Sequence, residues 1–292
     1  MIVVERNKFM PAKRDVIFKL LFGDELNKDL LIKFLMAILK PPLDEYDNVQ
    51  ISDPQSKRKY KDDKLAILDV KVRTTTGKIL NIEIQVHVTP EMRERIVFYN
   101  SRLMTEQLGS GDDYSLIKKT VNIVITGEKF IYEHERYHDK FTLYSSETKT
   151  EFTDIVEIHT LELPKLPKES DGTDLWNWLK FINADSEEEL NVLTQKSPGM
   201  KAPADRLMEL NQDPYARTVF EAREKQRRDN MALERRARME GKQEGREEGR
   251  KEGKYDIAKN LLKINMPVEN IIEVTGLTTQ EIKNLENTNK SF

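Results

Sequence analysis

Asp69 and Glu83 are the residues whose types and positions best suit chemistry in this sequence. They lie in two segments, 64–73 and 79–88, in which apolar and polar residues alternate with the period of a β-strand. Paired as a hairpin, the segments place Asp69 opposite Glu83, with Gln85 two residues further along the same polar face. Two carboxylates this close repel unless a cation lies between them, and a divalent ion such as Mg²⁺ is the simplest candidate.

The register of this hairpin follows from the alternation. Gly77 stands in the short connection where a three-residue hairpin loop favours a left-handed residue. If Val70 pairs with Ile82, Thr74 pairs with Lys78 and the apolar faces of both strands align. A slip of one residue would turn one apolar face to water, so we predict this register.

The pattern around Asp69 and Glu83 has two interpretations. A bound Mg²⁺ would lower the pKa of a water molecule and neutralise charge on a phosphodiester, and the Gln85 amide would orient the attacking water. The alternative is an ordinary half-buried strand pair whose polar face meets solvent. The spacing alone leaves both interpretations open.

The elements that must position these residues indicate an α/β domain that ends near Lys168. Segment 15–39 predicts two short helices separated at Gly23, and 91–108 predicts a helix directly after the hairpin. Further strands are expected at 120–126, 130–132, 141–144 and 156–163.

The rest of the chain predicts helices. Segments 175–184 and 187–193 have helical patterns, and 204–239 predicts one long charged helix. Glycine then recurs every fourth residue, at Gly241, Gly245, Gly249 and Gly253. This repeat is either a flexible charged tether or a helix whose glycine stripe forms a dimer seam.

The C-terminal residues 255–292 have the punctuation of a helix–turn–helix. Gly276 makes the turn, and Thr278 with Glu281 forms a capping box for the second helix. We therefore expect four regions: 1–168, an α/β domain; 169–240, a helical extension; 241–254, the glycine repeat; and 255–292, a small helical unit that serves docking or self-association at least as well as DNA binding.

Six separated motifs resemble the PD-(D/E)XK nuclease superfamily, as represented by the recombination-promoting nuclease/putative transposase (Rpn-type) family. They occur in the family's order and cover most of the chain. The motifs are DVIFKLLFG at 15–23, LDVK at 68–71, NIEIQ at 81–85, RIVFY at 95–99, GDDY at 111–114 and LELPK at 161–165.

This resemblance implies a restriction-endonuclease-like mixed sheet flanked by helices, followed by an α-helical C-terminal region, and metal-dependent hydrolysis of DNA. It implies that Asp69 and Glu83 bind Mg²⁺ together with the carbonyl of Ile84. Gln85 stands at the superfamily's lysine position and lacks the positive charge of a lysine. Asp15 matches an acid of the first helix that completes the site; its alternative role is to cap that helix.

A local set of residues suits contact with DNA phosphates. Arg95, Tyr99 and Arg102 share one face of the helix that follows the hairpin. Arginine would position the duplex and Tyr99 would hydrogen-bond or stack. Alternatively, Tyr99 belongs to the core and the arginines extend along the surface to solvent.

His134–His138 matches the H-E-x-x-H pattern of zinc peptidases. That chemistry requires both histidines on one face of a helix and a third ligand downstream. The segment lies between strand-like segments without an apolar helical stripe, which disfavours a zinc site.

Composition sets the remaining bounds. The chain has 292 residues, no cysteine and a net charge of −3, so disulfides and thiol catalysis are excluded and DNA must be bound by local basic patches. No apolar run approaches the ~18 residues of a membrane span. We expect a cytoplasmic Mg²⁺-dependent DNA endonuclease that forms a homo-oligomer through its C-terminal helices; the alternative is a catalytically weak DNA-binding or interaction protein that retains the fold.

Overall fold

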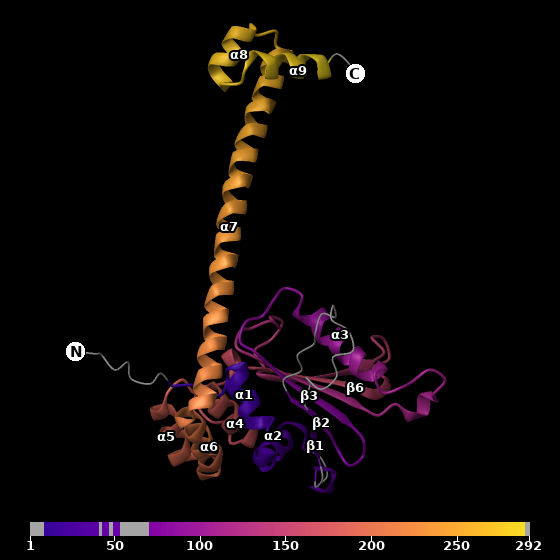
Figure 1. The fold of residues 1–292 in the computed structure, drawn as a ribbon. Helices are drawn as coiled ribbons and strands as arrows, with labels where there is room; N and C mark the ends of the chain where they lie inside the picture. The colour runs from indigo at the N-terminus through magenta and orange to yellow at the C-terminus, as the bar shows by residue number, and fades with distance from the viewer. Residues whose placement is uncertain (1–8, 41–42, 47–48, 53–69, 290–292) are drawn as a thin grey trace, which may run out of the picture. The chain divides into compact units, whose positions relative to one another are not determined.

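A six-stranded mixed sheet forms the centre of the first of two structural units (Figure 1). The computed structural model describes residues 9–40, 43–46, 49–52 and 70–289, and the units comprise Met1–Arg223 and Glu224–Phe292. The strand order is β1-β2-β3-β4-β6-β5, where β3, β4 and β6 are parallel and the other pairs antiparallel. The strands are β1 (Gln50–Ser52), β2 (Val70–Arg73), β3 (Ile79–Gln85), β4 (Thr120–Thr126), β5 (His138–Tyr144) and β6 (Glu151–Glu162).

Helices cover both faces of this sheet. On one face, the apolar side chains of β2, β3 and β4 join the main core with α1 (Asp15–Phe22), α2 (Lys28–Leu39) and α4 (Asp174–Asn183). Helices α5 (Glu187–Lys196) and α6 (Lys201–Gln212) extend the same core. The other face is covered by α3 (Met92–Thr105), which connects the parallel strands β3 and β4 (Figure 1). This arrangement is a restriction-endonuclease-like α/β fold, as expected.

The predicted hairpin register is confirmed. Val70 pairs with Ile82, and the Thr74 amide donates to the Lys78 carbonyl at 3.0 Å. Gly77 has φ +84°, the left-handed conformation that its place in the loop favours. Asp69, the residue before Val70, lies outside the described residues.

Three expectations about elements are wrong. Phe130–Tyr132 is not a strand: the Phe130 amide donates to the Glu162 Oε2 atom at 3.0 Å instead of a strand partner. The long helix expected at 204–239 is two helices, because α6 ends at Gln212 and a new helix begins at Pro214. Proline lacks the N–H that a helix interior needs but fits the first helical position. Strand β6 also begins at Glu151, five residues before the predicted start.

The second unit contains most of α7 (Pro214–Lys263) together with α8 (Val268–Thr275) and α9 (Thr279–Asn289). The glycine repeat is helical throughout. Ala258, Ile271 and Ile282 form a small core that joins the end of α7 to α8 and α9. The capping box is confirmed, because the Thr278 amide and hydroxyl both donate to the Glu281 Oε2 atom at 2.8 Å.

Candidate active site

Glu83 is a buried carboxylate near the end of a central strand. Alternation along β3 sends Leu80, Ile82 and Ile84 into the main apolar core, while Asn81 and Glu83 point to the face covered by α3. The Glu83 side chain is 1% exposed. The interpretation of this face as an ordinary solvated surface therefore does not hold, since α3 closes over it.

Two donors hold one oxygen of the Glu83 carboxylate. The Gln85 Nε2 atom donates to Glu83 Oε1 at 2.5 Å, and the Arg95 Nη2 atom donates to the same oxygen at 2.7 Å. The second oxygen, Oε2, is buried and has no hydrogen-bond partner among the described residues. A buried acceptor without a partner is costly, so this oxygen has room in its bonding for a further donor or a cation.

Burial raises the pKa of the Glu83 carboxyl above its ordinary value. The Arg95 guanidinium and the Gln85 amide act in the opposite direction, because both stabilise the ionised form. A cation at Oε2 would add to this stabilisation of the negative charge.

The donor set around Glu83 fits a hard divalent cation in part. A carboxylate oxygen without a partner and a nearby strand carbonyl, that of Ile84, are oxygen ligands of the kind Mg²⁺ takes. Within residues 9–40, 43–46, 49–52 and 70–289, no three His, Asp or Glu side chains cluster so that they could hold a metal. The second predicted carboxylate, Asp69, lies outside those ranges.

Asp15 is engaged elsewhere. It is the first residue of α1, and its Oδ1 atom accepts a hydrogen bond from the Val16 amide at 2.9 Å. Its Oδ2 atom pairs with the Arg223 guanidinium at 2.7 Å. Helix α1 packs on the sheet face opposite to Glu83.

The three predicted DNA-contacting residues all lie on α3 but have different surroundings. Arg95 binds Glu83 and lies with its guanidinium carbon 5.3 Å from the centre of the Tyr99 ring. Tyr99 is half-buried. Arg102 donates from Nε to Glu106 at 3.0 Å, one turn further along the helix. The structure thus joins Arg95 and Tyr99 to the Glu83 site, and Arg102 is paired separately.

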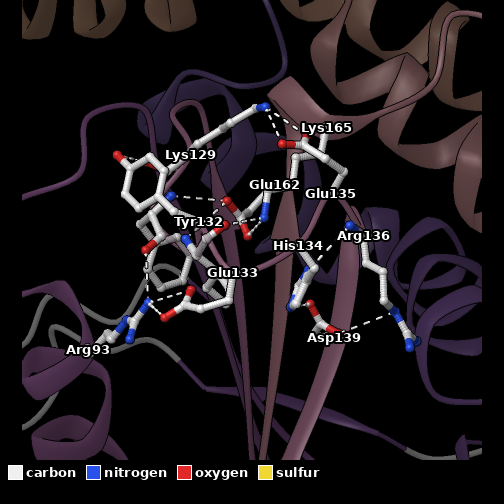
Figure 2. Close-up of polar contacts among 12 residues, drawn as sticks. Arg93, Lys129, Tyr132, Glu133, His134, Glu135, Arg136, Asp139, Glu162 and Lys165 are labelled. Atoms are coloured by element: carbon white, nitrogen blue, oxygen red, sulfur yellow. Dashed lines mark hydrogen bonds and ion pairs between the residues drawn. The ribbon is translucent and has the colours of Figure 1, made fainter.

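The H-E-x-x-H segment is not helical. His134 contacts Asp139, with 3.0 Å between Nε2 and Oδ2, and Arg136 contacts the same carboxylate (Figure 2). His138 begins β5 and shares a hydrogen bond with His159 instead. The two histidines of the motif therefore have different partners, unlike the paired ligands of a zinc peptidase.

A buried ion pair, Glu162–Lys165, was not predicted from the sequence. Glu162 ends β6 in the same row across the sheet as Gln85 and Thr126. The Lys165 Nζ atom donates to Glu162 Oε1 at 2.8 Å and to the Ile131 carbonyl, which fixes segment 130–131 against the sheet (Figure 2). The LELPK motif at 161–165 contains both residues of this pair, but its sequence does not show that the two charges are buried.

A second unpredicted cluster lies on the opposite face of the sheet. Glu157, His159 and His138 form a chain of hydrogen bonds of 2.7 and 2.8 Å beside a cavity of about 630 Å³. Burial lowers the pKa of His138 to about 4. Although burial alone raises the pKa of Glu157, hydrogen bonds from His159 and Lys119 bring it below its ordinary value.

The fold and the buried Glu83 site together define a nuclease-like α/β protein of the restriction-endonuclease type. A family model described as PD-(D/E)XK nuclease family transposase matches residues 12–237, and the chain belongs to this family. No curated protein and no solved structure matches the chain. In the described part of the chain, no helix has both the length and the apolar character that crossing a membrane requires.

Proposed function

We propose that this protein is a Mg²⁺-dependent endonuclease that hydrolyses phosphodiester bonds of DNA. The observation that carries the proposal is Glu83, a buried carboxylate of β3 with one oxygen held by Gln85 and Arg95 and the other without a described partner. Membership of a nuclease family supports a phosphodiester substrate.

Asp69 is the second carboxylate of the proposed site. Val70 pairs with Ile82, so a strand that continued by one residue would bring Asp69 opposite Glu83. We propose that these two side chains and the Ile84 carbonyl hold the ion. When bound, Mg²⁺ would supply the positive charge that offsets the charge developing on the phosphodiester.

Gln85 has two roles in this proposal. Its amide N–H holds Glu83 Oε1 in place, and its carbonyl oxygen would accept a hydrogen bond from the attacking water. Tyr99 and Arg102 would contact the DNA backbone from α3, because phosphate contacts position a duplex without reading its sequence.

Nicking of supercoiled plasmid in Mg²⁺ tests the proposal. We expect Asp69→Ala and Glu83→Gln each to lower the rate by at least about 100-fold, because each removes a charge that acts at the reacting centre. Glu83→Gln preserves shape, so its effect reports the lost charge. Glu133→Ala is the matched control, since this acid is exposed and paired with Arg93 away from the site.

Equal nicking by all four proteins would exclude this site. Retained DNA binding with no nicking by the wild-type protein would favour the alternative, a binding protein that keeps the fold. The specific observation behind that alternative is Gln85, an uncharged side chain at the superfamily's lysine position.

A further inference from the structure

Arg95 places a positive charge directly on the proposed metal-binding carboxylate. Its Nη2 atom lies 2.7 Å from Glu83 Oε1, and the arginine side chain is 36% exposed while that of Glu83 is 1% exposed. A carboxylate buried this deeply is costly unless a cation accompanies it. In the protein as described, Arg95 is the cation that neutralises Glu83.

Tyr99 gives the Arg95 guanidinium a second support. The ring lies one helical turn further along α3, with its centre 5.3 Å from the guanidinium carbon, within the range of a cation–π interaction. The Arg95 Nε atom is buried and has no hydrogen-bond partner among the described residues. If Arg95 loses its hydrogen bond to Glu83, its guanidinium still packs on the Tyr99 ring and its Nε–H is still available as a donor.

We propose that Arg95 is a mobile cation of the active site, an inference that rests on the proposed metal-dependent function. Arg95 neutralises Glu83 while the site holds no divalent ion. When Glu83 takes up the ion, Arg95 remains against Tyr99 and turns its donors to the DNA phosphate. It thereby supplies, from a helix, the positive charge that Gln85 does not provide at the lysine position.

Arg95 would leave Glu83 on metal binding because the guanidinium and the metal ion compete for the same carboxylate. Glu83 Oε1 already accepts hydrogen bonds from both Gln85 and Arg95. A guanidinium and a divalent cation on the same buried carboxylate repel each other strongly, because few water molecules separate them. Arg95 thus weakens metal binding in the free protein, and its release makes a guanidinium available to phosphate only when the site is loaded.

Mn²⁺ binding to the full-length protein, measured by calorimetry, tests this competition. We expect Arg95→Met to lower the Kd for Mn²⁺ roughly tenfold, the scale of one charge-assisted hydrogen bond. Arg95→Lys keeps the charge and should stay near the wild-type Kd. Arg93→Met is the matched control, because Arg93 lies on the same helix but pairs with Glu133 (Figure 2). Glu83→Gln should raise the Kd by more than about 100-fold.

Plasmid nicking at saturating Mn²⁺ provides the second measurement. We expect Arg95→Met to nick roughly 10- to 100-fold more slowly than wild type, although it binds Mn²⁺ more tightly. Damage to the fold would lower both the affinity for Mn²⁺ and the rate of nicking. A variant that binds Mn²⁺ more tightly but nicks more slowly therefore identifies the proposed role of Arg95. The thermal unfolding midpoint of each variant shows whether it folds, and Arg95→Gln replaces the methionine variant if that one does not.

The outcomes separate the two proposals. If Arg95→Met binds Mn²⁺ no more tightly than wild type while Glu83→Gln loses binding, the mobile-cation proposal is overturned and the metal site stands. If Glu83→Gln binds Mn²⁺ as well as wild type, the proposed function itself is overturned.

Discussion

Two buried glutamates, Glu83 and Glu162, differ at the residue scale in how completely their carboxylate oxygens are paired. Both are 1% exposed and both point to the same face of the sheet. Glu162 uses both oxygens: Oε1 accepts from Lys165, and Oε2 accepts from the Phe130 amide. Glu83 leaves one oxygen without a described partner. The complete pairing of Glu162 serves stability, whereas the unpaired oxygen of Glu83 is compatible with the metal site that we propose.

Loss of the Lys165 charge should therefore destabilise the fold. Lys165→Met would leave Glu162 buried without its cation, and we expect the free energy of unfolding to fall by about 3–5 kcal/mol. Urea unfolding measures the change. Lys129→Met is the control: its pair with Glu135 is exposed (Figure 2), so we expect a much smaller loss than for Lys165→Met. Equal losses in the two variants would show that burial of the Glu162–Lys165 pair contributes nothing.

The hairpin that carries Glu83 could be predicted from the sequence, but the contact between Glu83 and Arg95 could not. Alternation and the loop at Gly77 determine the register that pairs Val70 with Ile82. The spacing makes Arg95 a candidate contact to DNA, but nothing in it shows that the side chain also binds Glu83. That contact depends on how α3 lies across the sheet, which is a property of tertiary packing and not of local pattern.

At the scale of elements, the sequence predicts the regular helices and strands well but not the irregular connections between them. Strand β4 and helices α1 and α2 match their expected ranges closely, because long apolar runs and clear stops determine them. The break between α6 and α7 was missed, since the charged pattern continues on both sides of Pro214. The apolar pair Phe130 and Ile131 has the character of a strand segment. In the structure, however, the Phe130 amide donates to the Glu162 side chain, and the Ile131 carbonyl accepts from Lys165, so these groups are not paired with a neighbouring strand.

The glycine repeat should make α7 locally weak. Glycine in a helix interior costs about 1 kcal/mol relative to alanine, and a Cβ atom at Gly245 or Gly249 would meet nothing within 4 Å in the described structure. We expect each of Gly245→Ala and Gly249→Ala to slow amide hydrogen exchange in segment 241–253 about fivefold. Faster exchange in these variants would indicate that the stripe is a contact surface that alanine disturbs.

The capping box at the start of α9 predicts a pH dependence. Hydrogen bonds from the Thr278 amide and hydroxyl, with one from Tyr255, lower the pKa of Glu281 to about 2. A lowered pKa means that the contribution to stability is present above pH ~4.5 and is lost as the pH falls through about 2. In NMR titrations, we expect the Thr278 amide shift to move in this window. In Glu281→Gln, the Thr278 amide shift should not change with pH. If this variant shows the same pH-dependent shift as wild type, the titrating group is not Glu281.

At the scale of the whole molecule, the division into two units separates the site from the glycine repeat. Every described residue of the proposed site, and the main core, lies before residue 224. The family match ends at residue 237, before the first glycine of the repeat. The nuclease unit therefore has its own core, and the C-terminal unit has a separate small core of its own.

A chain ending at Glu240 tests what the remainder contributes. We expect it to keep Mg²⁺-dependent nicking at nearly the full-length rate, because the site and its core are retained. One site cuts one strand, so linearisation of plasmid takes two subunits or two successive visits. We expect the truncated chain to linearise plasmid more slowly than the full-length chain and to lose self-association in sedimentation velocity. A truncated chain that still self-associates would rule out assembly through the C-terminal helices. A truncated chain that melts cooperatively but does not nick would show that these helices act at the site itself.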